Sequence, residues 1–88
     1  MTVAFARLIE IIGDDPELIE VLYEVGVIRR EAEVLDEAEV DAALVARTLV
    51  RELEVNPPGV EIILRMREEI LAQRRQVAEL LALLKKRR

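Results

Sequence analysis

Five carboxylates lie close together near the start of the chain: Asp14, Asp15, Glu17, Glu20 and Glu24. Such a group can exchange protons, hold a divalent cation, or attract a basic partner. No Asp-x-Asp-x-Asp-Gly loop and no His accompanies them, which argues against the first two uses. The three glutamates recur at spacings of three and four, so on a helix they share one side. We interpret the five residues, called the acidic ridge below, as a docking surface for a basic partner; the alternative is a solvated helix face whose acids complement the helix dipole.

The amino-acid composition excludes most kinds of catalytic site. The chain contains no Cys, His, Ser or Trp, and its two threonines, Thr2 and Thr48, have no base beside them in sequence. A thiol or serine nucleophile, a disulfide and a zinc finger are therefore excluded, and no glycine-rich phosphate-binding motif occurs. Arg7 and Glu10 interrupt the first apolar run, and no long uncharged run follows. We expect a cytoplasmic protein without enzymatic activity, cofactor, metal or membrane segment.

Charge is distributed unevenly along the chain. Residues 1–64 carry a net charge of −10, whereas residues 65–88 carry +5. This asymmetry predicts an acidic head that attracts basic partners and repels phosphate.

The elements that must position the acidic ridge can be predicted from apolar spacing and helix-ending residues. A first amphipathic helix is expected over residues 3–12, with Gly13 as its end. Asp15 can cap a second helix, because Pro16 suits its first position and Gly26 can end it. The apolar stripe of this second helix is Leu18, Ile19, Leu22 and Val25. The tight turn between the two helices is typical of a helix-turn-helix.

A connector and a third helix follow. Residues 27–35 contain β-branched residues on both sides of a polar stretch, so they form either a minimal hairpin or an extended connector. Asp36 and Glu39 make a capping box, which opens a third helix that is expected to run to about Leu53.

The strongest boundary signal is the run Asn56, Pro57, Pro58 and Gly59. Asn56 can cap a helix, and both prolines fall within the first turn, where the backbone N–H groups have no helical acceptors. Nothing then breaks the helix from Val60 to about Lys86, which predicts a length of about 40 Å at about 1.5 Å per residue. The expected architecture is mainly α, with a head at residues 1–55 and a long helix at residues 56–88.

The long helix carries an apolar stripe at alternating spacings of three and four, typical of a coiled coil. We call this stripe the seam; it consists of Ile63, Met66, Ile70, Gln73, Val77, Leu80 and Leu84. We predict self-association, most simply as a dimer; packing back along its own head is the alternative. The four cations at residues 85–88 complement the helix dipole, and nucleic-acid or lipid binding is the weaker interpretation.

The order of these elements resembles that of MerR-type winged-helix regulators. The stretch Leu22-Tyr23-Glu24-Val25-Gly26-Val27-Ile28-Arg29 looks like the start of a MerR wing, and Leu35-Asp36-Glu37-Ala38-Glu39-Val40 looks like the beginning of the next helix. Two features depart from MerR: the wing is much shorter, and acids replace the basic residues that would contact DNA.

Both departures are shared by the CbpM-type chaperone modulators, which the chain resembles from about residue 24 to 77. The resemblance is sharpest at Arg51-Glu52-Leu53-Glu54-Val55-Asn56-Pro57-Pro58-Gly59-Val60-Glu61-Ile62-Ile63-Leu64. It implies a MerR-like helix-turn-helix head with a clipped wing, and a modulator that binds the basic face of the J-domain of a DnaJ-class co-chaperone and alters delivery to DnaK. The alternatives are a DNA-binding MerR-like regulator and a structural coiled-coil assembly module.

Overall fold

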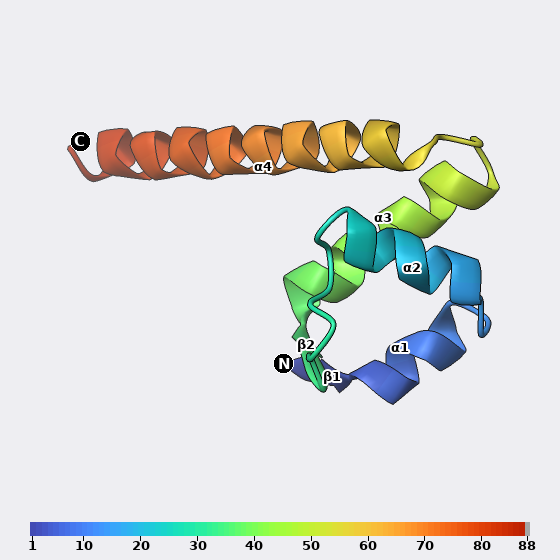
Figure 1. Ribbon diagram of the computed structural model, residues 1–88. Helices are drawn as coiled ribbons and strands as arrows, with labels where there is room; N and C mark the ends of the chain where they lie inside the picture. The colour runs from blue at the N-terminus through green and yellow to red at the C-terminus, as the bar shows by residue number, and fades with distance from the viewer. Residues whose placement is uncertain (88) are drawn as a thin grey trace.

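The computed structural model describes residues 1–87, which form a small head followed by a long helix (Figure 1). The elements in chain order are β1 (Thr2–Ala4), α1 (Phe5–Ile11), α2 (Pro16–Glu24), β2 (Val34–Asp36), α3 (Glu37–Arg51) and α4 (Pro57–Lys86). The prediction of a mainly helical protein with a long C-terminal helix is therefore confirmed.

The start of the chain differs from the prediction. Thr2–Ala4 is a strand, so the first helix begins at Phe5 instead of Val3. The strand pairs antiparallel with β2, with Val3 opposite Leu35, and the Phe5 N–H extends the ladder to the Glu33 carbonyl at 2.9 Å. The connector thus forms no hairpin of its own, because its strand pairs with the distant N-terminus. Helical spacing of apolar residues near the N-terminus could not reveal a partner that lies about thirty residues away.

The predicted helix boundaries in the middle of the head are largely confirmed. Gly13 and Gly26 follow α1 and α2 with φ of 82° and 81°, the left-handed conformation that glycine adopts without a steric penalty. At α3, Asp36 Oδ1 accepts from the Glu39 N–H at 2.8 Å and Glu39 Oε1 accepts from the Asp36 N–H at 3.0 Å, which completes the capping box.

The end of α3 falls earlier than predicted. The helix stops at Arg51, not near Leu53, and the chain then turns through Glu54, whose φ is 54°. The Leu53 N–H bonds to the Thr48 carbonyl at 3.2 Å and the Val55 N–H to the Leu49 carbonyl at 2.9 Å, so the last carbonyls of α3 are satisfied by the turn that follows it. Glycine is the usual residue at such a position, so a glutamate there gave no sequence signal.

An entirely apolar core holds the head together. Its buried side chains come from the helices of the head, the connector, β2 and the beginning of α4: Leu8, Ile12, Leu18, Leu22, Ile28, Leu35, Ala43, Ala46, Leu49 and Val60. Among the described residues no polar side chain is buried. All of these core residues are aliphatic, and the two alanines of α3 allow its neighbours to pack closely against it.

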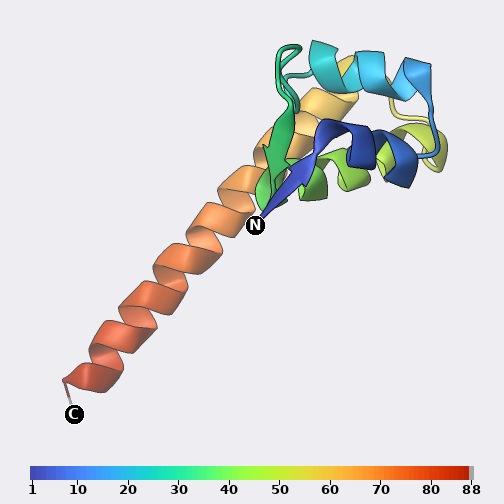
Figure 2. The same cartoon turned by 90° about the horizontal axis from the view of Figure 1, so that it is seen from below.

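Only the first part of α4 packs on the head. Val60 is fully buried and Leu64 packs against the core, whereas every residue from Gln73 to Arg87 is exposed. Figure 2 shows the C-terminal half of α4 extending well beyond the head, and the molecule measures 54 × 27 × 20 Å along its principal axes. Within residues 1–87, no helix is both long enough and apolar enough to span a membrane.

Candidate functional site: the acidic ridge and its surroundings

Helix α2 separates its residues into a buried side and an acidic side. Leu18 and Leu22 are 0% exposed and lie in the core. Glu17, Glu20 and Glu24 are exposed, so the three glutamates follow one another along the outer side of the helix. The fold therefore brings these three members of the acidic ridge together, as their spacing predicted.

Asp15 serves the fold of its own chain. Its Oδ1 accepts from the Leu18 N–H at 3.2 Å as the cap of α2, and its Oδ2 accepts from Arg51 Nε of α3 at 2.6 Å. The hydrogen bond from Arg51 is the main reason that the pKa of Asp15 is lowered, and the same bond raises the pKa of Arg51. Both carboxylate oxygens thus have partners. The sequence predicted the cap but gave no sign of an ion pair between residues so far apart.

Asp14 differs from its neighbour. It lies exposed in the turn between α1 and α2 with φ of 50°, a backbone conformation that Asp tolerates better than most residues. Within residues 1–87, Asp14, Glu17 and Glu24 form no ion pair. Their charges remain available to a partner.

Arg30 from the connector reaches the ridge. Its Nη2 lies 3.1 Å from Glu20 Oε2, and its guanidinium carbon lies 4.7 Å from the centre of the Tyr23 ring. The Tyr23 ring stacks in turn on Phe5 of α1, with ring centres 6.2 Å apart. Arg30 and Glu20 are mostly exposed, so this ion pair is weak and can exchange partners. The spacing of residues in the sequence gave no sign of this cation beside the ridge.

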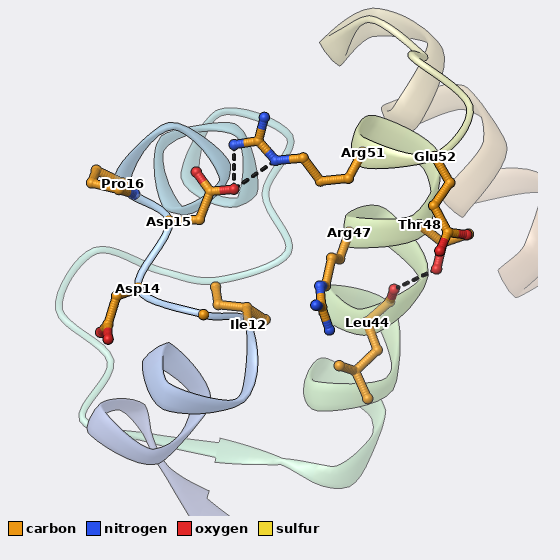
Figure 3. Close-up of a pocket in the computed structure, with 10 residues that line it drawn as sticks. Ile12, Asp14, Asp15, Pro16, Leu44, Arg47, Thr48, Arg51 and Glu52 are labelled. Atoms are coloured by element: carbon orange, nitrogen blue, oxygen red, sulfur yellow. Dashed lines mark hydrogen bonds and ion pairs between the residues drawn. The ribbon is translucent and has the colours of Figure 1, made fainter.

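A shallow surface hollow of about 670 Å³ lies between the turn that precedes α2 and helix α3. Figure 3 shows the Asp15–Arg51 pair bridging one side of it, with Arg47 and Leu44 on the α3 wall. The Thr48 hydroxyl there donates to the Leu44 carbonyl of its own helix at 3.4 Å. Within residues 1–87, no three potential ligands gather around a point that could hold a metal ion. The hollow is lined by charged side chains of both signs.

The helix junction forms as its residues predicted. Asn56 Oδ1 accepts from the Gly59 N–H at 2.8 Å, and Pro57 and Pro58 occupy the first two helical positions. Gly59 has a packing role: a Cβ there would lie 2.7 Å from Val55 Cγ1 and 3.0 Å from Asn56 Oδ1. A side chain at this position would disturb both Val55 and the cap.

The seam lies on α4 away from the residues that contact the head. Val60, Leu64 and Leu71 are buried or partly buried, whereas all seven seam residues are exposed. Leu80 and Leu84 are 60% and 61% exposed. Self-association stays a prediction, and the residues that would carry it lie on the surface.

Comparison with protein-family models, curated proteins and solved structures found no match to this chain.

Proposed function

We propose that the protein is a non-enzymatic, cytoplasmic chaperone modulator that binds the J-domain of a DnaJ-class co-chaperone through its acidic ridge. Binding there would alter the delivery of the co-chaperone to DnaK. The observation that carries the proposal is the outer side of α2, where Glu17, Glu20 and Glu24 lie exposed in a row. A rigid row of like charges attracts a basic helix and orients it.

The position of the buried residues supports this proposal. Leu18 and Leu22 fix the rotation of α2 in the core, so its glutamates cannot turn away from solvent without unfolding the helix. The cap at Asp15 and its bond to Arg51 fix the beginning of the same helix. A preorganised charged surface loses little conformational entropy when it binds.

The same geometry disfavours DNA as the ligand of α2. A helix that enters the major groove needs donors for base edges and cations for phosphates. The exposed side of α2 presents three carboxylates instead. We therefore propose a MerR-like helix-turn-helix head used for binding protein, with self-association through the seam as a second part of the proposal.

A titration tests the proposal directly. The purified protein is titrated with an isolated J-domain and, in parallel, with a mixed-sequence DNA duplex, at about 50 and about 200 mM salt. We expect J-domain binding that weakens as salt rises, and no DNA binding. DNA binding with a steep salt dependence and no J-domain signal would overturn the proposal in favour of a DNA-binding regulator that uses the basic end of α4.

The triple substitution Glu17→Lys, Glu20→Lys and Glu24→Lys should abolish J-domain binding while helicity is retained. A matched control reverses three other exposed glutamates, Glu54, Glu68 and Glu79, which changes the net charge equally but leaves the ridge intact. The control should bind with an affinity within a few-fold of the unmodified protein. Equal loss in both variants would show that net charge alone matters, and no loss in the first would remove the ridge from the mechanism.

A further inference from the structure

The ring of Tyr23 and the carboxylate of Glu20 hold a cation between α2 and the connector. The guanidinium carbon of Arg30 lies 4.7 Å from the centre of the Tyr23 ring, and its Nη2 lies 3.1 Å from Glu20 Oε2. We infer that this ring and carboxylate form a cation-binding site of the acidic ridge, which Arg30 fills in the free protein and an arginine of the basic partner fills in the complex. The inference rests on the proposed function and adds the kind of side chain that the partner contributes.

The chemistry of the site suits a planar cation. The face of an aromatic ring carries partial negative charge, which attracts a cation lying over it, and a carboxylate beside the ring adds a hydrogen-bond acceptor. Arginine suits both groups at once, because its flat guanidinium stacks on the ring while its N–H groups bond to the carboxylate. Lysine presents a compact ammonium that is more strongly hydrated. We therefore expect the site to prefer arginine to lysine.

The fold keeps the ring in place. Tyr23 packs against the core, and its ring stacks on Phe5 of α1 with the ring centres 6.2 Å apart and an angle of 25° between the planes. The preceding residue, Leu22, is fully buried, which fixes the rotation of α2 at this point. The ring therefore keeps its position when the cation over it leaves.

The side chain of Arg30 is held much more weakly. Its backbone lies in a turn in which the Ala32 N–H bonds to the Arg29 carbonyl at 3.1 Å. The Arg30 side chain is 68% exposed and that of Glu20 is 65% exposed, so solvent screens their ion pair. Arg30 can leave the site without uncovering the core. A weak internal occupant of this kind lowers the apparent affinity for an outside cation by the fraction of time that it fills the site.

The neighbouring glutamates define the spacing of the partner's cations. Glu17 and Glu24 lie on the same side of α2 as Glu20, about 4.5 and about 6 Å from it along the helix axis. Neither forms an ion pair within residues 1–87. A basic helix whose cations recur at spacings of three and four can place one cation at each glutamate. The partner that fits is therefore a helix with such a row of cations and an arginine at its centre.

Basic peptides test the site without the J-domain. Two synthetic helical peptides carry a row of cations spaced by three and four and differ only in the central one, which is arginine or lysine. Each is titrated into the full chain at about 50 mM salt. Arg30→Gln should tighten binding of the arginine peptide about two- to fivefold, because the internal competitor is removed.

Arg29→Gln is the matched control for this variant. It removes the same charge from the adjacent exposed residue, whose side chain forms no ion pair within residues 1–87. Its only effect on binding is the change in net charge, so it should tighten binding by no more than about 1.5-fold.

Replacing the ring separates recognition of arginine from attraction by charge. The unmodified protein should bind the arginine peptide about threefold more tightly than the lysine peptide. Tyr23→Leu keeps an apolar side chain against the core but removes the ring, so it should bind the two peptides equally. Tyr23→Phe restores the ring and should restore the preference. If circular dichroism shows that Tyr23→Leu is unfolded, the comparison of Arg30→Gln with Arg29→Gln still tests the inference.

Several results would overturn the inference. These are equal tightening by Arg30→Gln and Arg29→Gln, an arginine preference that survives in Tyr23→Leu, or no binding of either peptide. Weaker binding by Arg30→Gln would also overturn it, since Arg30 would then contact the partner instead of competing with it. An arginine preference that depends on the ring, together with no binding of the J-domain, would overturn the proposed function and leave the site. The two proposals therefore fail separately.

Discussion

Asp15 connects two helices through one carboxylate. It caps α2 through Oδ1 and bonds to Arg51 of α3 through Oδ2, so the turn before α2 is fixed to α3. Its neighbour Asp14 points into solvent from a left-handed turn. Two adjacent aspartates therefore differ in use: one maintains the fold, and the other contributes charge to the surface.

Asp15→Asn should separate the cap from the ion pair. The amide oxygen of Asn still accepts from the Leu18 N–H, but the charge that pairs with Arg51 is lost. The pKa of Asp15 is lowered in the folded protein, so its ionised form stabilises the fold above the ordinary value of 3.8, and this contribution disappears as pH falls through the lower folded value. The variant should unfold at a lower temperature than the unmodified protein at pH 7.

The pH dependence supplies the control for this prediction. The difference in melting temperature, followed by circular dichroism, should be largest above about pH 5. It should shrink below about pH 4, where the unfolded state of the unmodified protein begins to bind the proton, and vanish once the folded state binds it too. Asp14→Asn, which removes an equal charge from the adjacent position, should produce little change at any pH. A difference for Asp15→Asn that persists undiminished at low pH would assign the effect to the cap.

At the scale of elements, α4 belongs to two regions of the molecule. Its first turns complete the head, because Val60 is fully buried and Asp41 of α3 holds Arg67. Its C-terminal half leaves the head entirely (Figure 2). The folding of the head and the position of the long helix are thus coupled through a short apolar contact.

Val60→Ala measures this coupling. Removing two buried methyl groups without refilling the space should lower the free energy of unfolding by about 2 kcal/mol. Leu53→Ala removes more apolar volume from a side chain that is 63% exposed, and it should change stability by less than about 0.5 kcal/mol. Urea unfolding of both variants provides the comparison. A small effect of Val60→Ala would mean that the head folds without the first turns of α4.

Much of the element order could be predicted from local signals. The caps at Asp15, Asp36 and Asn56 and the glycines after α1 and α2 each act within a few residues, and all are present in the structure. What depends on distant parts of the chain could not be predicted. The pairing of β1 with β2 and the bonds of Arg51 and Arg67 join residues separated by more than twenty positions, and such contacts leave no periodic pattern.

In the candidate site, too, some features follow from local sequence and others depend on distant residues. The row of Glu17, Glu20 and Glu24 follows from helical spacing alone, and the burial of Leu18 and Leu22 agrees with it. Two other features depend on how the segments of the head pack. Asp15 is not a free charge, because it bonds to Arg51, and Arg30 lies beside Glu20. Helical periodicity therefore predicted the position of the acidic ridge, but it could not predict which of its carboxylates are free of ion pairs.

At the scale of the whole molecule, charge and shape vary together along the long axis. The acidic head lies at one end, and the exposed Lys85 and Lys86 lie in the last turn of α4 at the other. The seam runs between them. A partner that binds the head is therefore separated from the basic end by much of the length of α4.

Leu80→Glu combined with Leu84→Glu should convert the protein to a monomer. Both side chains lie in the seam and are exposed in the single chain, so charges there leave the head intact but repel a second copy. Sedimentation should show the monomer mass, with the unfolding of the head retained. A persisting dimer would place the association outside the seam. As a control, Glu68→Lys alters an exposed residue outside the seam and should leave the dimer unchanged.

The stacking of Tyr23 on Phe5 has an optical consequence. The chain contains one tyrosine and no tryptophan, so its intrinsic fluorescence comes from a single ring in the head. Arg30 covers that ring and is bonded to Glu20 of the acidic ridge. We expect a partner that draws Glu20 away from Arg30 to change the surroundings of the ring and therefore its emission. Tyr23 emission should therefore report occupancy of the ridge without a label, in any experiment where the partner lacks aromatic residues that emit at the same wavelength.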